Sequence, residues 1–399
     1  MSREHYTSFG KILIFILLSL ILSLPLPTHA FEKTFDLLPL TAKGLFSELG
    51  QENQGPAAIE KGLSFKPTKE SQVFKPAAEI SLDMAVMAFD MGDLDGDGKV
   101  ELVIVGRKKL LVYQREGKSF VLNDILKASW GEDFLKVSVG DTDDNGIQEI
   151  YLVSRYGTRA RSTAWEWTGD FGRLHRKTGH IRVVKLPGGS KSLLLFQDSR
   201  ADEFFSGRIY VVNYEKKGKL TKRQKLPELR GVQFYTLGLF DLDKDGNPEW
   251  LGLGEPGLGD QSRLYVWDQQ GNILWSGDKK LGGTNNAITL GEKEPGQPRR
   301  IPFNSRLVIT DIDGDGNKEI LAIKNIPLIK HLLNFKVYTK SRLIAYRIEG
   351  TSLFPAWATG EIDYCLTDMQ AEGRTLFLAA HKGKVLNIGK ESGLIMWFE

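Results

Sequence analysis

Four short segments of this chain place acidic side chains at alternating positions, a spacing that suits metal ligation. Each segment begins with Asp, continues with oxygen-bearing residues at the third and fifth positions, and has Glu at the ninth. They span residues 93–101, 141–149, 241–249 and 311–319. Such an all-oxygen set suits a hard cation, and Ca²⁺ takes about six to eight oxygen ligands. The pattern therefore predicts up to four structural Ca²⁺ ions.

The predicted ligands occupy the same five positions in every segment. Side chains at positions one, three, five and nine supply carboxylate or amide oxygens, and position seven supplies a backbone carbonyl. A glycine at position six permits the tight turn that points the oxygens inward. The ligands are Asp93, Asp95, Asp97, Lys99 and Glu101; Asp141, Asp143, Asn145, Ile147 and Glu149; Asp241, Asp243, Asp245, Asn247 and Glu249; and Asp311, Asp313, Asp315, Asn317 and Glu319.

These segments differ from EF-hands, which begin in the same way. An EF-hand needs an acidic residue at position twelve and a helix on each side. Position twelve is Ile104, Leu152, Gly252 or Ala322, and the flanking residues are rich in β-formers. A single copy could equally be an acidic surface turn, whereas four copies with one spacing favour metal binding. We expect weak affinity, with a Kd of about 10⁻⁴–10⁻³ M.

Short β-rich runs surround each acidic segment and indicate a repeat. One run precedes the loop, one follows it, and a third is often aromatic, as in residues 134–139, 149–153 and 164–167. The double-length step from Asp141 to Asp241 predicts a ligand-free unit at about 191–214. A last degenerate unit fits residues 363–388. The fold class predicted is all-β: a β-propeller of six or seven four-stranded blades, with Ca²⁺ loops between the first and second strands.

The N-terminal part differs from the repeat region. Residues 1–30 combine positive charge, an apolar run and small residues before a cleavage point, which is typical of a signal peptide. An uncleaved anchor is the alternative. Residues 31–80 predict a short helix and a linker, or a docking element, and residues 81–399 the propeller. We therefore expect an exported protein, periplasmic or extracellular, with no transmembrane anchor after cleavage.

The acidic motif resembles the FG-GAP/VCBS repeats of the integrin α-subunit N-terminal propeller and of many secreted bacterial proteins. The motif Gly-Asp-x-Asp-x-Asp-Gly-x-x-Glu-Ile/Leu is present at residues 92–102 and, with Asn145 for the third Asp, at 140–150. Phe240 and Thr310 replace the first Gly in the other copies, and the Phe-Gly/Gly-Ala-Pro half of the family name is not visible. The resemblance implies a β-propeller with Ca²⁺ in its blade loops and binding roles more often than catalysis.

The composition narrows the function classes. The formal net charge is +3 and Cys365 is the only cysteine, so no internal disulfide forms and a packed thiol is expected. Four bound Ca²⁺ ions would make the chain distinctly basic, which suits an anionic partner. We expect a monomeric binding scaffold for a protein or glycan, without a nucleic-acid partner. The alternative is a carbohydrate-active enzyme, a polysaccharide lyase or hydrolase, built on the propeller.

Overall fold

The computed structural model describes residues 63–64, 73–74, 76–187, 191–215, 219–254, 261–294, 297–328, 337–382 and 392–399. The predicted signal peptide and most of the predicted helix and linker segment lie outside these residues. Within them, the only helical element is the short 3₁₀ turn η1 (Phe234–Thr236). No helix in this part of the chain has the length and apolarity needed to cross a membrane.

Four-stranded antiparallel units, built from strands that follow one another in the chain, form the fold. The first three units are β4 (Ala88–Gly92), β5 (Glu101–Val105), β6 (Lys109–Glu116) and β7 (Ser119–Lys127); β8 (Glu132–Gly140), β9 (Glu149–Tyr156), β10 (Arg159–Trp167) and β11 (Phe171–Thr178); and β12 (His180–Lys185), β13 (Ser192–Asp198), β14 (Ser206–Glu215) and β15 (Lys219–Lys225).

The remaining units follow the same plan. They are β16 (Gly238–Phe240), β17 (Glu249–Gly254), β18 (Gln261–Trp267) and β19 (Ile273–Ser276); β23 (Val308–Thr310), β24 (Glu319–Pro327), β25 (Tyr338–Glu349) and β26 (Ser352–Ala358); and β27 (Cys365–Glu372), β28 (Thr375–Lys382) and β29 (Ser392–Phe398) with β3 (Ala78–Leu82). The short strand β20 (Leu281–Gly282) pairs with both β18 and β24 and so links the fourth and fifth units.

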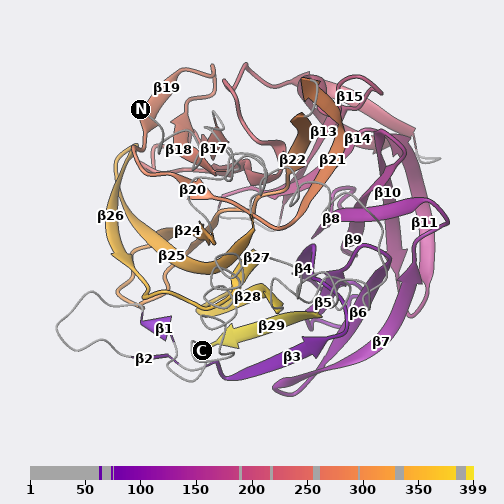
Figure 1. Ribbon diagram of the computed structural model, residues 1–399, viewed down its shortest axis with the longest axis horizontal. Coiled ribbons are helices and arrows are strands. Elements are labelled where there is room, and N and C mark those ends of the chain that lie inside the picture. Colours follow the sequence, from indigo (N-terminus) through magenta and orange to yellow (C-terminus); the bar gives the residue numbers. More distant parts are fainter. Residues whose placement is uncertain are drawn as a thin grey trace, which may run out of the picture. The chain divides into compact units, whose positions relative to one another are not determined.

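The units form a closed ring, and the ring is a six-bladed β-propeller. The first strand of each blade is innermost: β4 packs against β8, β8 against β12, β12 against β16, and β27 against β4. The sixth blade takes its outer strand from the other end of the chain, because β3 pairs antiparallel with β29 (Figure 1). The propeller predicted from sequence is confirmed, and six is the observed number of blades among the described residues.

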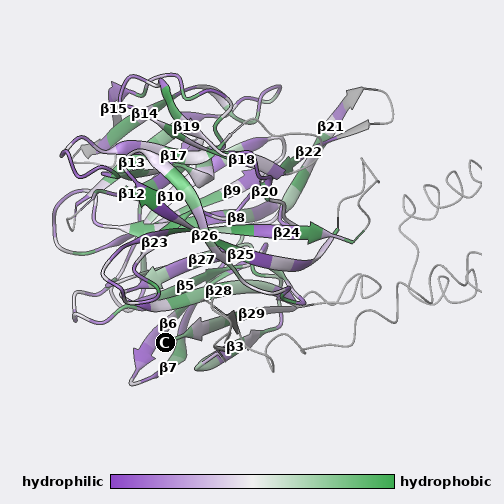
Figure 2. Ribbon diagram, turned by 90° about the vertical axis from the view of Figure 1, so that its left-hand side faces the viewer, coloured by the Kyte–Doolittle hydropathy of each residue, from purple (hydrophilic) through white to green (hydrophobic). Residues whose placement is uncertain are grey.

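Burial explains why the inner strands form. Every residue of β4 and β5 is buried, as expected for strands covered on both faces by neighbouring blades. The outer strand β7 instead alternates between half-buried and exposed residues, because only one face meets the next blade. Figure 2 shows green hydrophobic segments along the inner strands and purple ones along outer strands such as β15. The predicted ligand-free unit is the third blade, in which β13 and β14 follow β12.

An inserted hairpin, β21 (Ala287–Glu294) and β22 (Gln297–Pro302), follows the fourth blade and extends from it in Figure 2. Its base reaches across the ring, because Asn286 Nδ2 donates to the carbonyl of Met87 at 2.6 Å. In the other direction, Arg107 Nη2 of the first blade donates a hydrogen bond to the carbonyl of Ala287 at 3.1 Å. The long step between the third and fourth acidic loops thus contains this hairpin and no further blade.

Two short segments differ from the sequence-based boundaries. β1 (Leu63–Ser64) and β2 (Val73–Phe74) pair as a ribbon inside the segment expected to be a helix and linker. β3 begins at Ala78, slightly before the expected start of the propeller at residue 81. The run at 384–388, expected to be a strand of the last blade, lies outside the described residues, and the third strand of that blade is β29.

Because β3 closes the ring, the protein should be less stable without this strand. A chain that begins at residue 76 keeps β3, whereas one that begins at residue 84 lacks it and loses buried Leu82. Burying one leucine is worth about 2 kcal/mol, and the lost strand pairing adds to this. We expect the shorter chain to melt several degrees lower in a thermal denaturation scan. Equal melting temperatures for the two chains would contradict closure by β3.

Candidate metal centres

The four acidic loops occupy equivalent places in four blades. They join β4 to β5, β8 to β9, β16 to β17, and β23 to β24, so each connects the first and second strands of its blade. The third and sixth blades carry no such loop in the described part of the chain. The antiparallel order puts all four loops at the same end of the ring, because every first strand runs in the same direction.

Backbone amides fold each loop around its first aspartate. The glycine at position six donates its N–H to the Oδ2 of the aspartate at position one in every loop. The pairs are Gly98 to Asp93 at 2.9 Å, Gly146 to Asp141 at 2.9 Å, Gly246 to Asp241 at 3.2 Å and Gly316 to Asp311 at 3.1 Å. These glycines have φ between 81° and 91°, which confirms the need for glycine at the turn.

The glutamate at position nine closes each loop from the strand side. Its Oε2 accepts the backbone N–H of position two, so the first and last ligands of the loop are held together. The bonds are Leu94 to Glu101 at 2.8 Å, Thr142 to Glu149 at 3.2 Å, Leu242 to Glu249 at 2.8 Å and Ile312 to Glu319 at 3.3 Å. All four glutamates are buried, which places one carboxylate beneath each loop.

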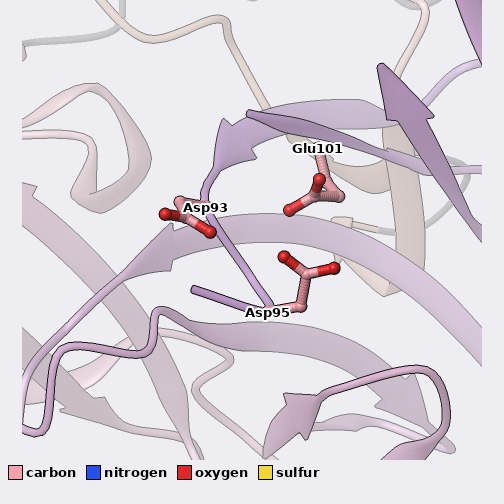
Figure 3. A group of neighbouring side chains, drawn as sticks. All are labelled: Asp93, Asp95 and Glu101. Carbon is pink, nitrogen blue, oxygen red and sulfur yellow. The ribbon is translucent and has the colours of Figure 1, made fainter. Parts of the chain in front are cut away.

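Carboxylate oxygens converge in each loop to within 4.8 Å of one another. Figure 3 shows the first group, in which the carboxylates of Asp93, Asp95 and Glu101 gather around one small space. The groups are Asp93, Asp95 and Glu101; Asp141, Asp143 and Glu149; Asp241, Asp243 and Glu249; and Asp311, Asp313 and Asp315. The predicted ligands at positions one and three are therefore brought together in every loop.

Some predicted ligands lie outside these groups. They are the side chains of Asp97, Asp245 and Glu319. Asp97 instead forms an ion pair with Lys99 at 2.7 Å. The position-seven residues donate their backbone N–H to the side chain at position five, as in Lys99 to Asp97 at 2.8 Å. The carbonyl ligand from position seven remains a prediction.

Unsatisfied buried oxygens mark the loops as places for a cation. Asp141 Oδ1, Glu149 Oε1 and Asp241 Oδ1 are buried without a hydrogen-bond partner. A buried polar atom without a partner costs about 1–3 kcal/mol. These atoms are carboxylate oxygens, which accept hydrogen bonds. Only a hydrogen-bond donor or a cation can therefore satisfy them. The all-oxygen donor set fits Ca²⁺.

The pKa values of the loop glutamates point the same way. Burial, followed by repulsion from the neighbouring aspartates, raises the pKa of Glu101, Glu149 and Glu319 to about 7. The pKa of Glu249 is raised for the same reasons. A carboxylate with a raised pKa is in an environment that disfavours its negative charge. A divalent cation among these oxygens removes the repulsion.

Position four of the loops is a feature that the sequence analysis did not single out. Asp144 and Lys244 have φ of 60° and 63°, and the glycines at the same position have 77° and 74°. Where glycine is present, its N–H donates to Oδ1 of the first aspartate, at 2.8 Å in Gly96 and 2.7 Å in Gly314. The loops without that glycine are the two with the unsatisfied Oδ1. In the sequence, the glycines at position four of the first and fourth loops indicate this left-handed conformation.

Two other residues with polar or reactive side-chain atoms are packing groups. Trp167, near an arginine-rich hairpin, is fully buried and donates its indole N–H to Asp124 at 3.1 Å. Cys365 is buried, and burial raises the pKa of its thiol to about 12. Both features belong to the core of the blades.

The ring and its loops define a class, the β-propeller with acidic loops between the first and second strands of its blades. Comparison with family models then identifies residues 93–152 as an FG-GAP-like repeat. This match spans the first two acidic loops and confirms the repeat expected from the sequence. No curated protein matches the chain.

Solved structures similar to this chain share little sequence with it. A glucose dehydrogenase aligns over 82% of this chain and 99% of its own, with a TM-score of 0.44 and 11% identity. The soluble aldose sugar dehydrogenase of Escherichia coli covers 80% and 99%, with a TM-score of 0.40 and 12% identity. A chain of the mitotic checkpoint complex covers 84% and 98%, with a TM-score of 0.46 and 11% identity. Such distant likenesses carry no information about activity.

The glutamate pKa values predict that stabilisation by Ca²⁺ increases with pH. In the metal-free protein, a pKa raised from 4.5 to about 7 contributes stability that is complete below pH 4.5 and is lost as the pH rises to about 7. Bound Ca²⁺ offsets the charge repulsion. We expect the melting temperature to rise little at pH 5, and much more at pH 8, when Ca²⁺ replaces EGTA. No shift at either pH, with no metal found by elemental analysis, would reject the metal sites.

Position four predicts a stabilising substitution. Lys244→Gly removes a side chain from a left-handed backbone conformation, which glycine adopts without steric strain. We expect the free energy of unfolding of the metal-free protein to rise by about 1 kcal/mol in urea denaturation. Lys318→Gly is the control, because Lys318 is an exposed loop lysine without positive φ. If both variants lose stability equally, the backbone argument fails.

Proposed function

We propose that this protein is an exported calcium-binding β-propeller that acts as a binding scaffold for a protein or glycan. The observation that carries this proposal is the convergence of carboxylate oxygens in four equivalent loops, three of whose oxygens are buried and unsatisfied. The ions would hold the connection between the inner strands of four blades. Asp93, Asp95 and Glu101, with their counterparts in the other loops, would supply the ligands. The role of the metal is structural.

The end of the ring opposite the metal loops offers a surface for a partner. Trp130, in the connection between β7 and β8, is 93% exposed. Tyr156 at the end of β9 is 45% exposed, and the guanidinium of Arg161 lies 4.5 Å from the centre of its ring. Gly131 lies against the Tyr156 ring and so brings Trp130 near it. Exposed aromatic rings beside arginine suit stacking on a sugar, and the arginine suits an acidic one.

Binding is proposed in preference to catalysis because reactive side chains of the described core are engaged structurally. His180 is fully buried, with Nδ1 2.7 Å from Tyr235 Oη and Nε2 2.7 Å from the carbonyl of Phe204. Burial lowers its pKa to about 3, so it stays neutral. We propose a periplasmic or extracellular location and a monomeric state. These follow from the predicted signal peptide and from a ring that closes on itself.

A glycan array combined with a substitution tests this function. We expect the Ca²⁺-loaded protein to bind acidic glycans, and Trp130→Ala to weaken binding about tenfold, since base or sugar stacking on an aromatic ring is worth about 1–3 kcal/mol. Phe354→Ala is the matched control, because Phe354 is an aromatic residue that is 40% exposed on a different blade. Polysaccharide degradation by the purified protein would overturn the scaffold role, and unchanged binding by Trp130→Ala would overturn the surface.

A further inference from the structure

Inner strands of the ring direct polar side chains into a cavity at its centre, here called the axial cavity. Its polar lining comes from β8, β12, η1, the residue two before β23, and β27: Lys136, Ser138, Arg182, Tyr235, Arg306 and Asp368. Asp90 of β4 lies behind this lining and contacts Arg306. Five blades thus contribute directly to one small polar space, and the sixth contributes through Asp90.

One cation of the axial cavity is fully paired. Arg306 lies between two buried carboxylates, with Nη1 2.8 Å from Asp90 Oδ2 and Nη2 3.2 Å from Asp368 Oδ2. It also donates to the carbonyl of Phe89 at 2.6 Å. Burial opposes the charge, but the two carboxylates outweigh it and hold the pKa of Arg306 above its usual value. Asp90 and Asp368 therefore share this arginine, whose single positive charge offsets one of their two negative charges.

Two other cations lack such partners. Lys136 is 4% exposed, and its ammonium lies 3.8 Å from Asp368 Oδ2, too far for a hydrogen bond. Burial lowers its pKa to about 8. Among the described residues, no hydrogen bond or ion pair engages the guanidinium of Arg182, and burial with the nearby Arg306 lowers its pKa as well. Arg306, Lys136 and Arg182 carry three positive charges against the two negative charges of Asp90 and Asp368, so the cavity has one positive charge in excess.

Of the two neighbouring hydroxyls, that of Ser138 keeps a proton that it can donate to an anion. Nε2 of His180 lies by the carbonyl of Phe204 and must carry the proton, so Nδ1 accepts from the hydroxyl of Tyr235. The Tyr235 proton is thus committed to His180. Ser138 Oγ accepts the backbone N–H of Val183 at 3.0 Å, which leaves its own proton free to donate. Donors from Lys136, Ser138 and Arg182 line one cavity.

We propose that the axial cavity binds a small anion with carboxylate or oxyanion geometry, held by Arg182 and Lys136. A guanidinium binds two oxygens of such an ion at once, and an ammonium adds a point charge. The free space in the cavity is about 20 Å³, close to the room that one water molecule takes, so an ion of a few atoms suits it better than a sugar ring. This site is separate from the acidic loops and from the Trp130 surface, and it does not depend on the proposed function.

Thermal melting of the full Ca²⁺-loaded protein tests the site. Sodium sulfate or sodium acetate replaces sodium gluconate at constant ionic strength, since gluconate is too bulky for the cavity. We expect a saturable rise in melting temperature with sulfate or acetate. A response to chloride alone, or no response to either oxygen-bearing anion, would overturn the proposal.

Two substitutions separate the axial cavity from general surface charge. Arg182→Gln should weaken sulfate binding at least about tenfold, whereas Arg176→Gln, which removes an exposed arginine of β11, should leave it unchanged. Arg182→Gln should also melt no lower than wild type in gluconate, because it removes the excess positive charge of the cavity. Isothermal titration of the wild-type protein with sulfate gives a second measurement independent of the folding of the variant. Absence of binding heat, or an equal loss in both variants, would contradict the site.

Discussion

The pairing of β3 with β29 is the constraint on which the ring depends. A blade exposes two apolar faces, and each is covered only when a neighbouring blade lies against it. With five blades complete in sequence, the sixth would still lack its outer strand, and β3 supplies it from the opposite end of the chain. The buried aromatic residues Phe377 and Trp397, stacked with centroids 5.9 Å apart, then pack beneath the closed sheet. Closure therefore converts six weak units into one core.

Negative and positive charges lie in different parts of the ring. Negative charge gathers in the four loops at one end, where the glutamates at position nine are buried beneath it. Positive charge is in excess on the axis, where Arg306, Lys136 and Arg182 face only the two carboxylates of Asp90 and Asp368. The glutamates at position nine and Lys136 are buried, so water does not hydrate these charges directly. Both therefore favour bound ions of opposite sign.

The sequence allowed much of the fold to be predicted, because the acidic loops repeat with one spacing. Their flanking runs identified the first and second strands of four blades, and the double-length step identified the third blade. The long step from Asp241 to Asp311 left room for further strands, but their form as an inserted hairpin was not predicted, because its residues carry no repeat. Its role depends on distant contacts such as Asn286 to Met87.

The candidate sites were predictable to different degrees. Positions one and three of the loops converge as the spacing implies, whereas Asp97 turns to Lys99. The axial residues gave no signal in the sequence, because each blade contributes a different residue type at a similar depth. Asp90, Lys136, Arg182 and Arg306 become neighbours only when the ring closes. The repeat in the sequence identifies the loops and strands that the blades have in common. It does not identify a site made of different residues from different blades.

Closure by the two ends of the propeller also determines when the protein can become complete. β29 is made long after β3, and β3 must wait for it while more than three hundred intervening residues are added. During that interval earlier blades can form pairwise, but the ring stays open and one apolar face on either side of the gap remains exposed. The ring therefore closes, and the exposed faces are covered, only once β29 is available to pair with β3.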